Sequence, residues 1–375
     1  MPIEPMRRAW MEVDCRALRA NYEAVTQRIP AGCRMLPMVK ADAYGAGAAL
    51  AVRSLAPLGP YGFGVATVQE ARELRGEGWD GRIVVFTPVW PADVEELLDH
   101  GLEAVVGGLD ALRACGAGAR ASGERMAAHL EIDTGMGRFG LPWHDREGWA
   151  AAVRGEVDAG GVALASTFTH FHSAETDGEA TREQFSRLEA ARDALREAEV
   201  DPGLAHAANS AAALEYSGVA ADMVRPGIWL YGAAVAGRRP RPVVSVRTRV
   251  LAVRDVPAGS TVSYGATWTA PAPARLATLG IGYADGLRRD LSGRARALVK
   301  GRAAPVRGVI TMDSTVIDVT GRNDVRPGDV ATLLGRDGDE EIRPEELAEA
   351  CDTIAYEILT GWSRRVPKIG MDGDE

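Results

Sequence analysis

Short apolar runs alternate with amphipathic stretches through the first two thirds of the chain. Helical periodicity marks the intervening segments, such as residues 91–100 and 179–199, and Asp14, Pro91 and Gly101 supply start and stop signals. The eight predicted strands are residues 34–39, 61–66, 82–86, 103–107, 127–133, 161–168, 204–208 and 221–224. This repeated strand–helix order predicts a parallel α/β barrel, (β/α)8 of the TIM type, with its helices outside. A doubly wound open sheet is the alternative.

The pattern changes at the Arg- and Pro-rich segment 237–242. Beyond it, β-branched runs separated by Gly, Pro and Asp turns predict a mostly β C-terminal domain, with one helical stretch at residues 345–359. The predicted strands there are residues 243–256, 274–283, 295–301, 304–312 and 314–319. We therefore divide the chain into a barrel, residues 1–236, and a β-rich domain, residues 237–375. The strand predicted at residues 9–14 could pair with either domain.

Composition narrows the class of protein. Hydrophobic residues make up 46% and charged residues 25% of the 375 residues, which is typical of a globular protein. The net charge of −9 disfavours binding to nucleic acid or to an anionic membrane. No apolar window is long enough to span a membrane, and the N-terminus lacks a signal-peptide pattern. Four scattered cysteines indicate reduced, cytosolic thiols rather than a disulfide framework or a zinc cluster.

Lysine is unusually rare. Of the 43 basic residues, only Lys40, Lys300 and Lys368 are lysine, and the other 40 are arginine. An amine can lose its proton and form a Schiff base, whereas a guanidinium keeps its proton in proteins. Lys40 comes directly after the first predicted barrel strand, so we expect it to be present for its amine.

Polar side chains gather where the predicted barrel strands end, which is where such barrels carry their chemistry. The strand ends carry Lys40, Arg138 in a glycine-rich loop, His170 and His172, Asn209 and Ser210, and Arg225 followed by Gly227. His170 and His172 are two residues apart, so both rings could lie on one face of a strand and bind a metal. No third ligand is evident, so a metal site is disfavoured. The loops after the last two strands commonly bind phosphate. A phosphate-bearing aldehyde, pyridoxal phosphate, would explain both these loops and the lysine.

Nine segments, in order across both domains, resemble the alanine racemase family. They are VKADAYGAG (39–47), EIDTGMGRFG (131–140), THF (169–171), AANSAA (207–212), DMVRPGIWLYG (222–232), VSYGATW (262–268), IGYADG (281–286), ITMDSTVIDV (310–319) and YEILTGWSRRVPKI (356–369). The resemblance implies a pyridoxal-phosphate barrel followed by a β-domain. It also implies a homodimer with shared active sites that interconverts L- and D-alanine for peptidoglycan in a bacterial cytoplasm.

The resemblance also implies a role for each matching residue. Lys40 would hold the cofactor and act as one acid/base, and Tyr264 of the partner subunit would be the other. Arg225 would face the pyridine nitrogen, with His170 between Arg225 and Tyr264. The implied cofactor-binding residues are Lys40, Tyr44, Arg138, His170, Asn209, Ser210, Arg225, Gly227, Ile228 and Tyr356. The implied substrate-binding residues are Arg138 together with Tyr283, Met312 and Asp313 of the partner subunit.

The sequence departs from the family pattern at three positions. Ala46 stands where the family usually has His, and Thr311 where it usually has Cys. Glu131 stands where the family usually places a lysine that becomes carbamylated. We expect Glu131 to supply the negative group that orients Arg138, as a charged hydrogen-bond acceptor. In the alternative, Glu131 pairs elsewhere and water or an anion holds Arg138.

Several functions remain open at this stage. Tyrosines and Met312 around the α-carbon would favour a small side chain, so alanine is the predicted substrate and serine the second. The same architecture could serve a decarboxylase or another racemase, although the Tyr264 and Met312-Asp313 segments favour the alanine enzyme. A cofactor-holding regulator without turnover would not need a second acid/base. An unrelated barrel hydrolase would form no Schiff base.

Overall fold

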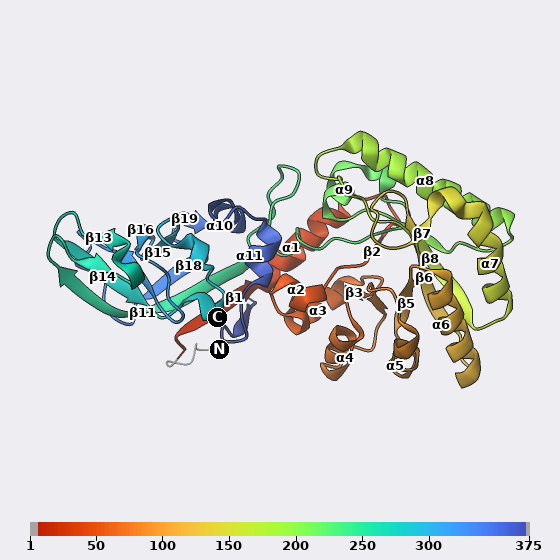
Figure 1. The fold of residues 1–375 in the computed structure, drawn as a ribbon, viewed down its shortest axis with the longest axis horizontal. Coiled ribbons are helices and arrows are strands. Elements are labelled where there is room, and N and C mark those ends of the chain that lie inside the picture. The colour runs from red at the N-terminus through yellow and green to blue at the C-terminus, as the bar shows by residue number, and fades with distance from the viewer. Residues whose placement is uncertain (1–6, 373–375) are drawn as a thin grey trace.

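The computed structural model describes residues 7–372. Figure 1 shows two parts at opposite ends of the long axis, a barrel surrounded by helices and an elongated β-domain. Strand β1 (Ala9–Asp14) lies in the β-domain, and helix α1 (Cys15–Thr26) leads from it into the barrel. No helix in residues 7–372 is long and apolar enough to cross a membrane.

The predicted barrel is confirmed, and each of its eight strands has a counterpart. These strands are β2 (Arg34–Met35), β3 (Phe63–Val65), β4 (Ile83–Val85), β5 (Glu103–Val106), β6 (Met126–Asp133), β8 (Val162–Phe168), β9 (Leu204–His206) and β10 (Met223–Val224). Six of them pair in parallel in the order β3-β4-β5-β6-β8-β9. Strand β10 pairs with β2, Asp222 N–H donates to Ala205 O, and a bridge joins Met38 to Gly64. These contacts close the sheet, so the open-sheet alternative is wrong.

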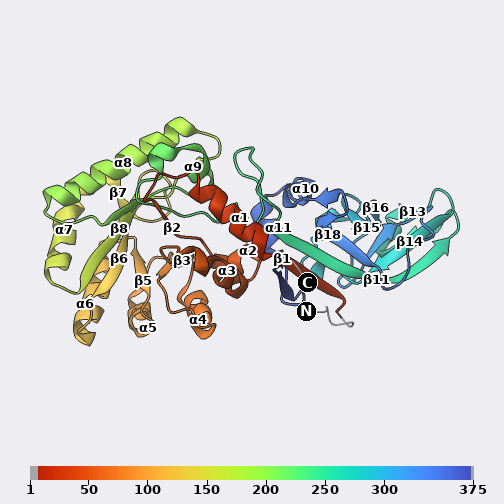
Figure 2. The same ribbon diagram turned by 180° about the vertical axis from the view of Figure 1, so that it is seen from behind.

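Helices cover the outside of the barrel (Figures 1 and 2). The longer ones are α3 (Ala48–Leu55), α4 (Val68–Gly76), α5 (Val94–Asp99), α6 (Leu109–Ser122), α7 (Arg146–Asp158) and α8 (Gly178–Glu197). Their ends follow the expected signals, because the Asp14 carboxylate accepts from Ala17 N–H and Gly101 ends α5 with a positive φ. Side chains on β6 alternate, with Leu130 in the core under the helices and His129 and Glu131 on the barrel interior.

The β-domain is one sheet in the order β19-β18-β15-β16-β17-β14-β11-β1-β20, and an additional β18–β11 pairing curls it. Its strands are β11 (Val244–Val256), β14 (Ala274–Leu279), β15 (Arg296–Val299), β16 (Arg302–Arg307), β17 (Thr315–Asp318), β18 (Val330–Asp337), β19 (Glu340–Ile342) and β20 (Lys368–Met371). A separate hairpin joins β12 (Thr261–Val262) to β13 (Trp268–Thr269). Strand β1 pairs with β11 and β20, which settles its open assignment in favour of the β-domain.

Two predictions for this domain need correction. The helix predicted at residues 345–359 is two helices, α10 (Pro344–Ala350) and α11 (Ala355–Thr360), because the chain turns between them with Asp352 at φ +53°. The strand predicted at residues 274–283 ends at Leu279. Beyond it, a side chain at Gly282 would lie 2.2 Å from Thr311 O, so the chain leaves the sheet there in a tight turn.

The cap at Asp14 gives a test of the junction between the domains. Replacing Asp14 with Ala removes the acceptor for Ala17 N–H, so we expect the free energy of unfolding to fall by about 1 kcal/mol. Urea unfolding followed by circular dichroism measures this change. The exposed Glu23 on the same helix provides the control, because Glu23→Ala should shift the value by less than about 0.5 kcal/mol. Equal effects of the two substitutions would show that the cap contributes nothing.

Candidate active site

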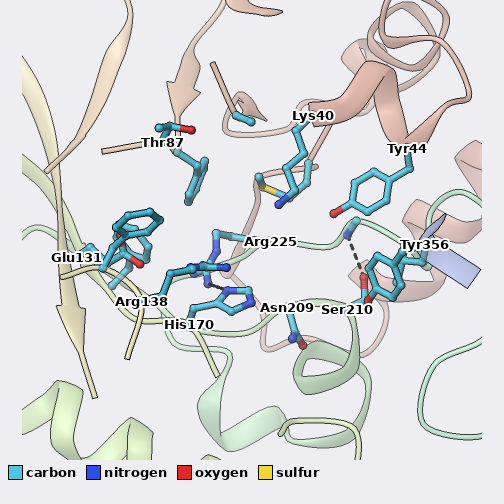
Figure 3. Close-up of a pocket in the computed structure, with 17 residues that line it drawn as sticks. Lys40, Tyr44, Thr87, Glu131, Arg138, His170, Asn209, Ser210, Arg225 and Tyr356 are labelled. Atoms are coloured by element: carbon cyan, nitrogen blue, oxygen red, sulfur yellow. Dashed lines mark hydrogen bonds between the residues drawn. The ribbon is translucent and has the colours of Figure 1, made fainter. Parts of the chain in front are cut away.

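A cavity of about 260 Å³ opens at the carboxyl ends of the barrel strands (Figure 3). It brings together all ten residues to which the sequence assigned the cofactor, and Glu131 also lines it. Its lining residues are Met38, Lys40, Tyr44, Ala66, Phe86, Thr87, Glu131, Arg138, Phe139, Phe168, His170, Asn209, Ser210, Arg225, Gly227, Ile228 and Tyr356. In Figure 3, Ser210 and Tyr356 lie at one end of the space and Glu131 at the other, with Arg225 and His170 between them.

Lys40 and Tyr44 reach this cavity from a left-handed turn. The segment α2 (Lys40–Tyr44) has φ values of 51–54° from Ala41 to Tyr44, a conformation that costs ordinary L residues about 1–2 kcal/mol each. Surrounding contacts hold the turn in place, since the Glu70 carboxylate accepts from the backbone N–H of Ala41 and of Ala66. Asp42 accepts from Ala48 N–H and pairs with Lys368. The turn thus presents an amine and a phenol side by side.

The amine of Lys40 has an environment that favours its neutral form. Burial lowers the pKa of Lys40, and the guanidinium groups of Arg138 and Arg225 lower it further, against a smaller opposite effect of Glu70. Lys300 pairs with Asp329, and Lys368 pairs with a carboxylate on the turn beside Lys40. Lys40 makes no ion pair with any residue in the range 7–372. The rare lysine after the first strand therefore also has a depressed pKa.

Arg225 lies at the base of the cavity and is only 4% exposed. Its Nη2 donates to the carbonyl oxygens of Thr169 (2.9 Å) and Ala207 (3.1 Å), and its Nη1 donates to His206 Nδ1 (2.7 Å). Burial lowers the pKa of Arg225 to about 10, so the group remains a cation at neutral pH. No hydrogen bond within the described chain uses its Nε–H, which leaves this donor available to a ligand.

His170 is held in its neutral form. Its Nδ1 lies 3.4 Å from Arg225 Nη2. Burial lowers the pKa of His170 to about 3, with further contributions from Arg225, Arg138 and Lys40. An uncharged ring beside three cations can accept a hydrogen bond from the guanidinium without adding another positive charge.

The other end of the cavity forms a narrow polar cradle. A side chain at Gly227 would lie 2.2 Å from Tyr44 Oη, so only glycine leaves room for the phenol there. Gly227 N–H donates to Ser210 Oγ (2.9 Å), while no partner within the described chain accepts from the backbone N–H of Ile228. Hydroxyl groups and an unpaired N–H of this kind suit an anionic oxygen. Asn209 has a local role in addition, because its side chain accepts from Ala212 N–H and caps α9 (Ser210–Glu215).

Glu131 is buried at the opposite end of the cavity from this cradle. Burial raises the pKa of Glu131, and attraction by Arg138 and Arg225 partly offsets the rise. No hydrogen bond and no ion pair within 4 Å joins Glu131 to Arg138 among the described residues, so the expected direct bond is not formed in this structure. A glutamate is several bonds shorter than a carbamylated lysine, which explains the gap.

The residues expected to act on the partner subunit lie apart from the cavity. Tyr264 is 74% exposed on the β-domain, and Tyr283 and Met312 are also exposed. Asp313 is fixed by ion pairs with Arg365 (2.6 Å) and Arg8 (4.0 Å). These side chains therefore lie on the surface of the same chain, outside the cavity.

Sequence reasoning missed part of the lining. The residues not predicted are Met38, Ala66, Phe86, Thr87, Phe139 and Phe168. Ala66 and Thr87 follow the second and third barrel strands, so the rule that located Lys40 would also have found them had it been applied to every strand. In residues 7–372 no group of three His, Cys, Asp or Glu side chains is placed to hold a metal.

Comparison with known proteins agrees with this architecture. The family model described as the alanine racemase N-terminal domain matches residues 13–235, and the model of the C-terminal domain matches residues 243–370. The chain belongs to the alanine racemase family. An alanine racemase of Symbiobacterium thermophilum is 40% identical over 98% of each chain, and one of Halothermothrix orenii is 35% identical over 96% of each.

Solved structures of the alanine racemase family share the whole fold. The alanine racemase of Streptomyces lavendulae, a D-cycloserine producer, has a TM-score of 0.89 and 36% identity, with 98% of this chain and 97% of that chain covered. A histidine racemase from Leuconostoc mesenteroides has the same TM-score with 28% identity, and covers 98% and 99%. The fold of the family therefore accommodates more than one amino-acid substrate.

The depressed pKa of Lys40 predicts selective reactivity. Near neutral pH, limiting formaldehyde and cyanoborohydride should methylate Lys40 before Lys300 and Lys368, since a lowered pKa leaves more of the amine unprotonated. Peptide mass spectrometry of protein freed of cofactor measures the order. The difference should shrink at about pH 11, above the usual lysine pKa of about 10.4. Uniform labelling of the three lysines near neutral pH would contradict the assignment.

Proposed function

We propose that this protein interconverts L-alanine and D-alanine with pyridoxal phosphate and supplies D-alanine for peptidoglycan in a bacterial cytoplasm. The observation that carries the proposal is one cavity in which a lysine of lowered pKa faces a buried guanidinium, with an anion cradle at one end. Family membership and relatives named alanine racemase, at up to 40% identity, support the same activity.

The lining of the cavity offers groups suited to each part of pyridoxal phosphate. The phosphate would be held by Tyr44, Ser210, Tyr356 and the backbone N–H of Ile228. Because Gly227 has no side chain, the Tyr44 hydroxyl can lie directly beside the backbone there. Lys40 would bind the aldehyde, and the free Nε–H of Arg225 would meet the pyridine nitrogen. When bound, the cofactor makes the α-proton of an amino acid acidic by withdrawing electrons from the α-carbon.

Racemisation requires one group on each face of the α-carbon. Lys40 Nζ removes or returns the α-proton on one face, and its lowered pKa brings it towards working pH. The phenol of Tyr264 from the partner subunit does the same on the other face. Arg225 keeps its proton, because the pKa of its guanidinium stays at about 10 even when buried. Arg138 meets the substrate carboxylate as a cation.

We infer that the second acid/base comes from another copy of the chain. The C-terminal domain, which we take as residues 237–375, carries Tyr264, Tyr283, Met312 and Asp313 outside the cavity of its own barrel. Large side chains exposed on a surface commonly mark a protein–protein contact. A homodimer in which each β-domain completes the partner's barrel supplies both faces of the α-carbon.

Racemisation of another amino acid is the second candidate, favoured by the histidine racemase with the same fold. A panel of L-amino acids with purified holoenzyme separates the two. We expect alanine to have the highest kcat/KM and serine to be second, because aromatic side chains crowd the site. Lys40→Ala should have no measurable turnover. Faster turnover of histidine, lysine or arginine than of alanine would overturn the assignment.

A shared site predicts complementation between inactive variants. Lys40→Ala and Tyr264→Phe subunits, mixed under conditions of subunit exchange, should recover up to about one quarter of native activity. With random pairing in a two-fold symmetric dimer, half of the dimers are mixed, and each of those has one intact site of two. Mass spectrometry of tagged subunits verifies the exchange. Verified exchange with no recovered activity would refute the shared site.

A further inference from the structure

Beneath the cavity, a continuous chain of hydrogen bonds runs through the interior of the barrel. Arg225 Nη1 bonds to His206 Nδ1 (2.7 Å), and His206 Nε2 bonds to Ser166 Oγ (2.7 Å). Ser166 Oγ bonds to His129 Nδ1 (2.6 Å), and His129 Nε2 bonds to Glu103 Oε2 (2.9 Å). We call these five residues the interior relay. All five are buried, and they lie on or directly after neighbouring strands.

The two ends of the interior relay fix its direction. Arg225 has only donors, and an ionised carboxylate has only acceptors. Burial raises the pKa of Glu103, but its interactions with His129 and Arg82 outweigh burial and lower the pKa, which favours the ionised form. Its Oε1 receives Arg82 Nη1 at 2.5 Å, at the opposite end of the barrel interior from the cavity.

Only one arrangement of protons satisfies every group when both rings are neutral. His129 donates from Nε2 to the Glu103 carboxylate, so its Nδ1 accepts from the hydroxyl of Ser166. That hydroxyl oxygen then accepts from Nε2 of His206, whose Nδ1 accepts from the guanidinium. The reverse order would set an N–H of His206 against an N–H of Arg225, and a ring lone pair of His129 against the carboxylate.

We propose that Glu103 is a remote positioning residue for Arg225, acting through Ser166 and the tautomers of His129 and His206. The guanidinium needs a neutral acceptor beside it, because a ring that donated or carried charge would push it out of place. The carboxylate sets the tautomer of that acceptor, His206, through three hydrogen bonds. Aligned bonds in a low-dielectric interior also strengthen one another. This inference rests on the proposed function only where it assigns Arg225 to the cofactor.

Nitrogen-15 spectra of histidine rings test the relay directly. Replacing His100, His144 and His172 with Gln leaves three rings, those of His129, His170 and His206, in the holoenzyme. Long-range proton–nitrogen correlations then report which nitrogen of each ring carries a proton. We expect both His129 and His206 to be neutral with the proton on Nε2. A proton on Nδ1 of either ring, or a charged ring, would overturn the proposal. This arm does not depend on racemase activity.

Kinetics of two matched variants test the consequence for Arg225. Ser166→Ala interrupts the relay. The control is Thr167→Val in the next residue of the same strand, which removes a buried hydrogen bond to Pro202 O (2.7 Å) outside the relay. We expect Ser166→Ala to lower kcat for alanine about tenfold with KM nearly unchanged, and Thr167→Val to change kcat less than about twofold. If the two substitutions lower kcat equally and reduce thermal stability equally, the relay serves only to stabilise the fold. If native protein turns over no amino acid, the proposed function fails and the ring spectra alone decide the relay.

Discussion

The organisation of the barrel interior depends on one buried cation. A guanidinium that is only 4% exposed has lost most of its hydration, and such a loss is costly unless protein acceptors replace the water. Among residues 7–372, no carboxylate hydrogen-bonds to Arg225. Carbonyl oxygens after β8 and β9 and the ring of His206 serve instead. The strands that supply these acceptors must therefore end at the same level, which a closed parallel barrel ensures.

The charge of Arg225 also affects the protonation of its neighbours. Burial is the main reason for the lowered pKa values of Lys40 and His170, and the charges of Arg225 and Arg138 lower both values further. A cavity with the guanidinium groups of Arg225 and Arg138 and the single buried carboxyl group of Glu131 has a positive field. That field favours a ligand with a phosphate and a carboxylate, and it makes the Lys40 amine easier to deprotonate.

The spacing of apolar residues predicted the barrel well, because this spacing differs between its strands and its helices. Gly, Pro and Asp also mark where these elements begin and end. The rule that chemistry sits at strand ends placed Lys40, His170 and Arg225 in one cavity. The interior relay escaped prediction, since Glu103, His129 and Ser166 lie inside strands where a polar residue is typical of a solvent-facing position. Their burial depends on closure of the barrel. Strand β18 was also missed, and its pairing with β11 is set by contacts distant in sequence.

Both proposed acid/bases lie beside backbone conformations that their sequences do not favour. Lys40 opens a turn of four L residues with positive φ, and Tyr264 follows Ser263, whose φ is +65°. Strained backbone conformations of this kind persist only where contacts with the surrounding structure hold them in place. Glu70 provides those contacts for the first turn, and for the second the Ser263 hydroxyl donates to Val309 O at 2.6 Å.

The two turns differ in how closely their own chain packs against them, and this difference bears on function. The turn of Lys40 packs against the chain's own α11, where a side chain at Gly45 would lie 2.1 Å from Leu359 O. Tyr264 is 74% exposed in its own chain, although the hydroxyl of the preceding Ser263 is held by a hydrogen bond to Val309 O. Maintaining a strained turn in order to display a phenol brings no stability to a single copy. The proposed dimer would explain this strain, because the phenol would then have a fixed position to reach on another copy. Rigidity at both turns would set the separation between the two proposed proton-transfer groups.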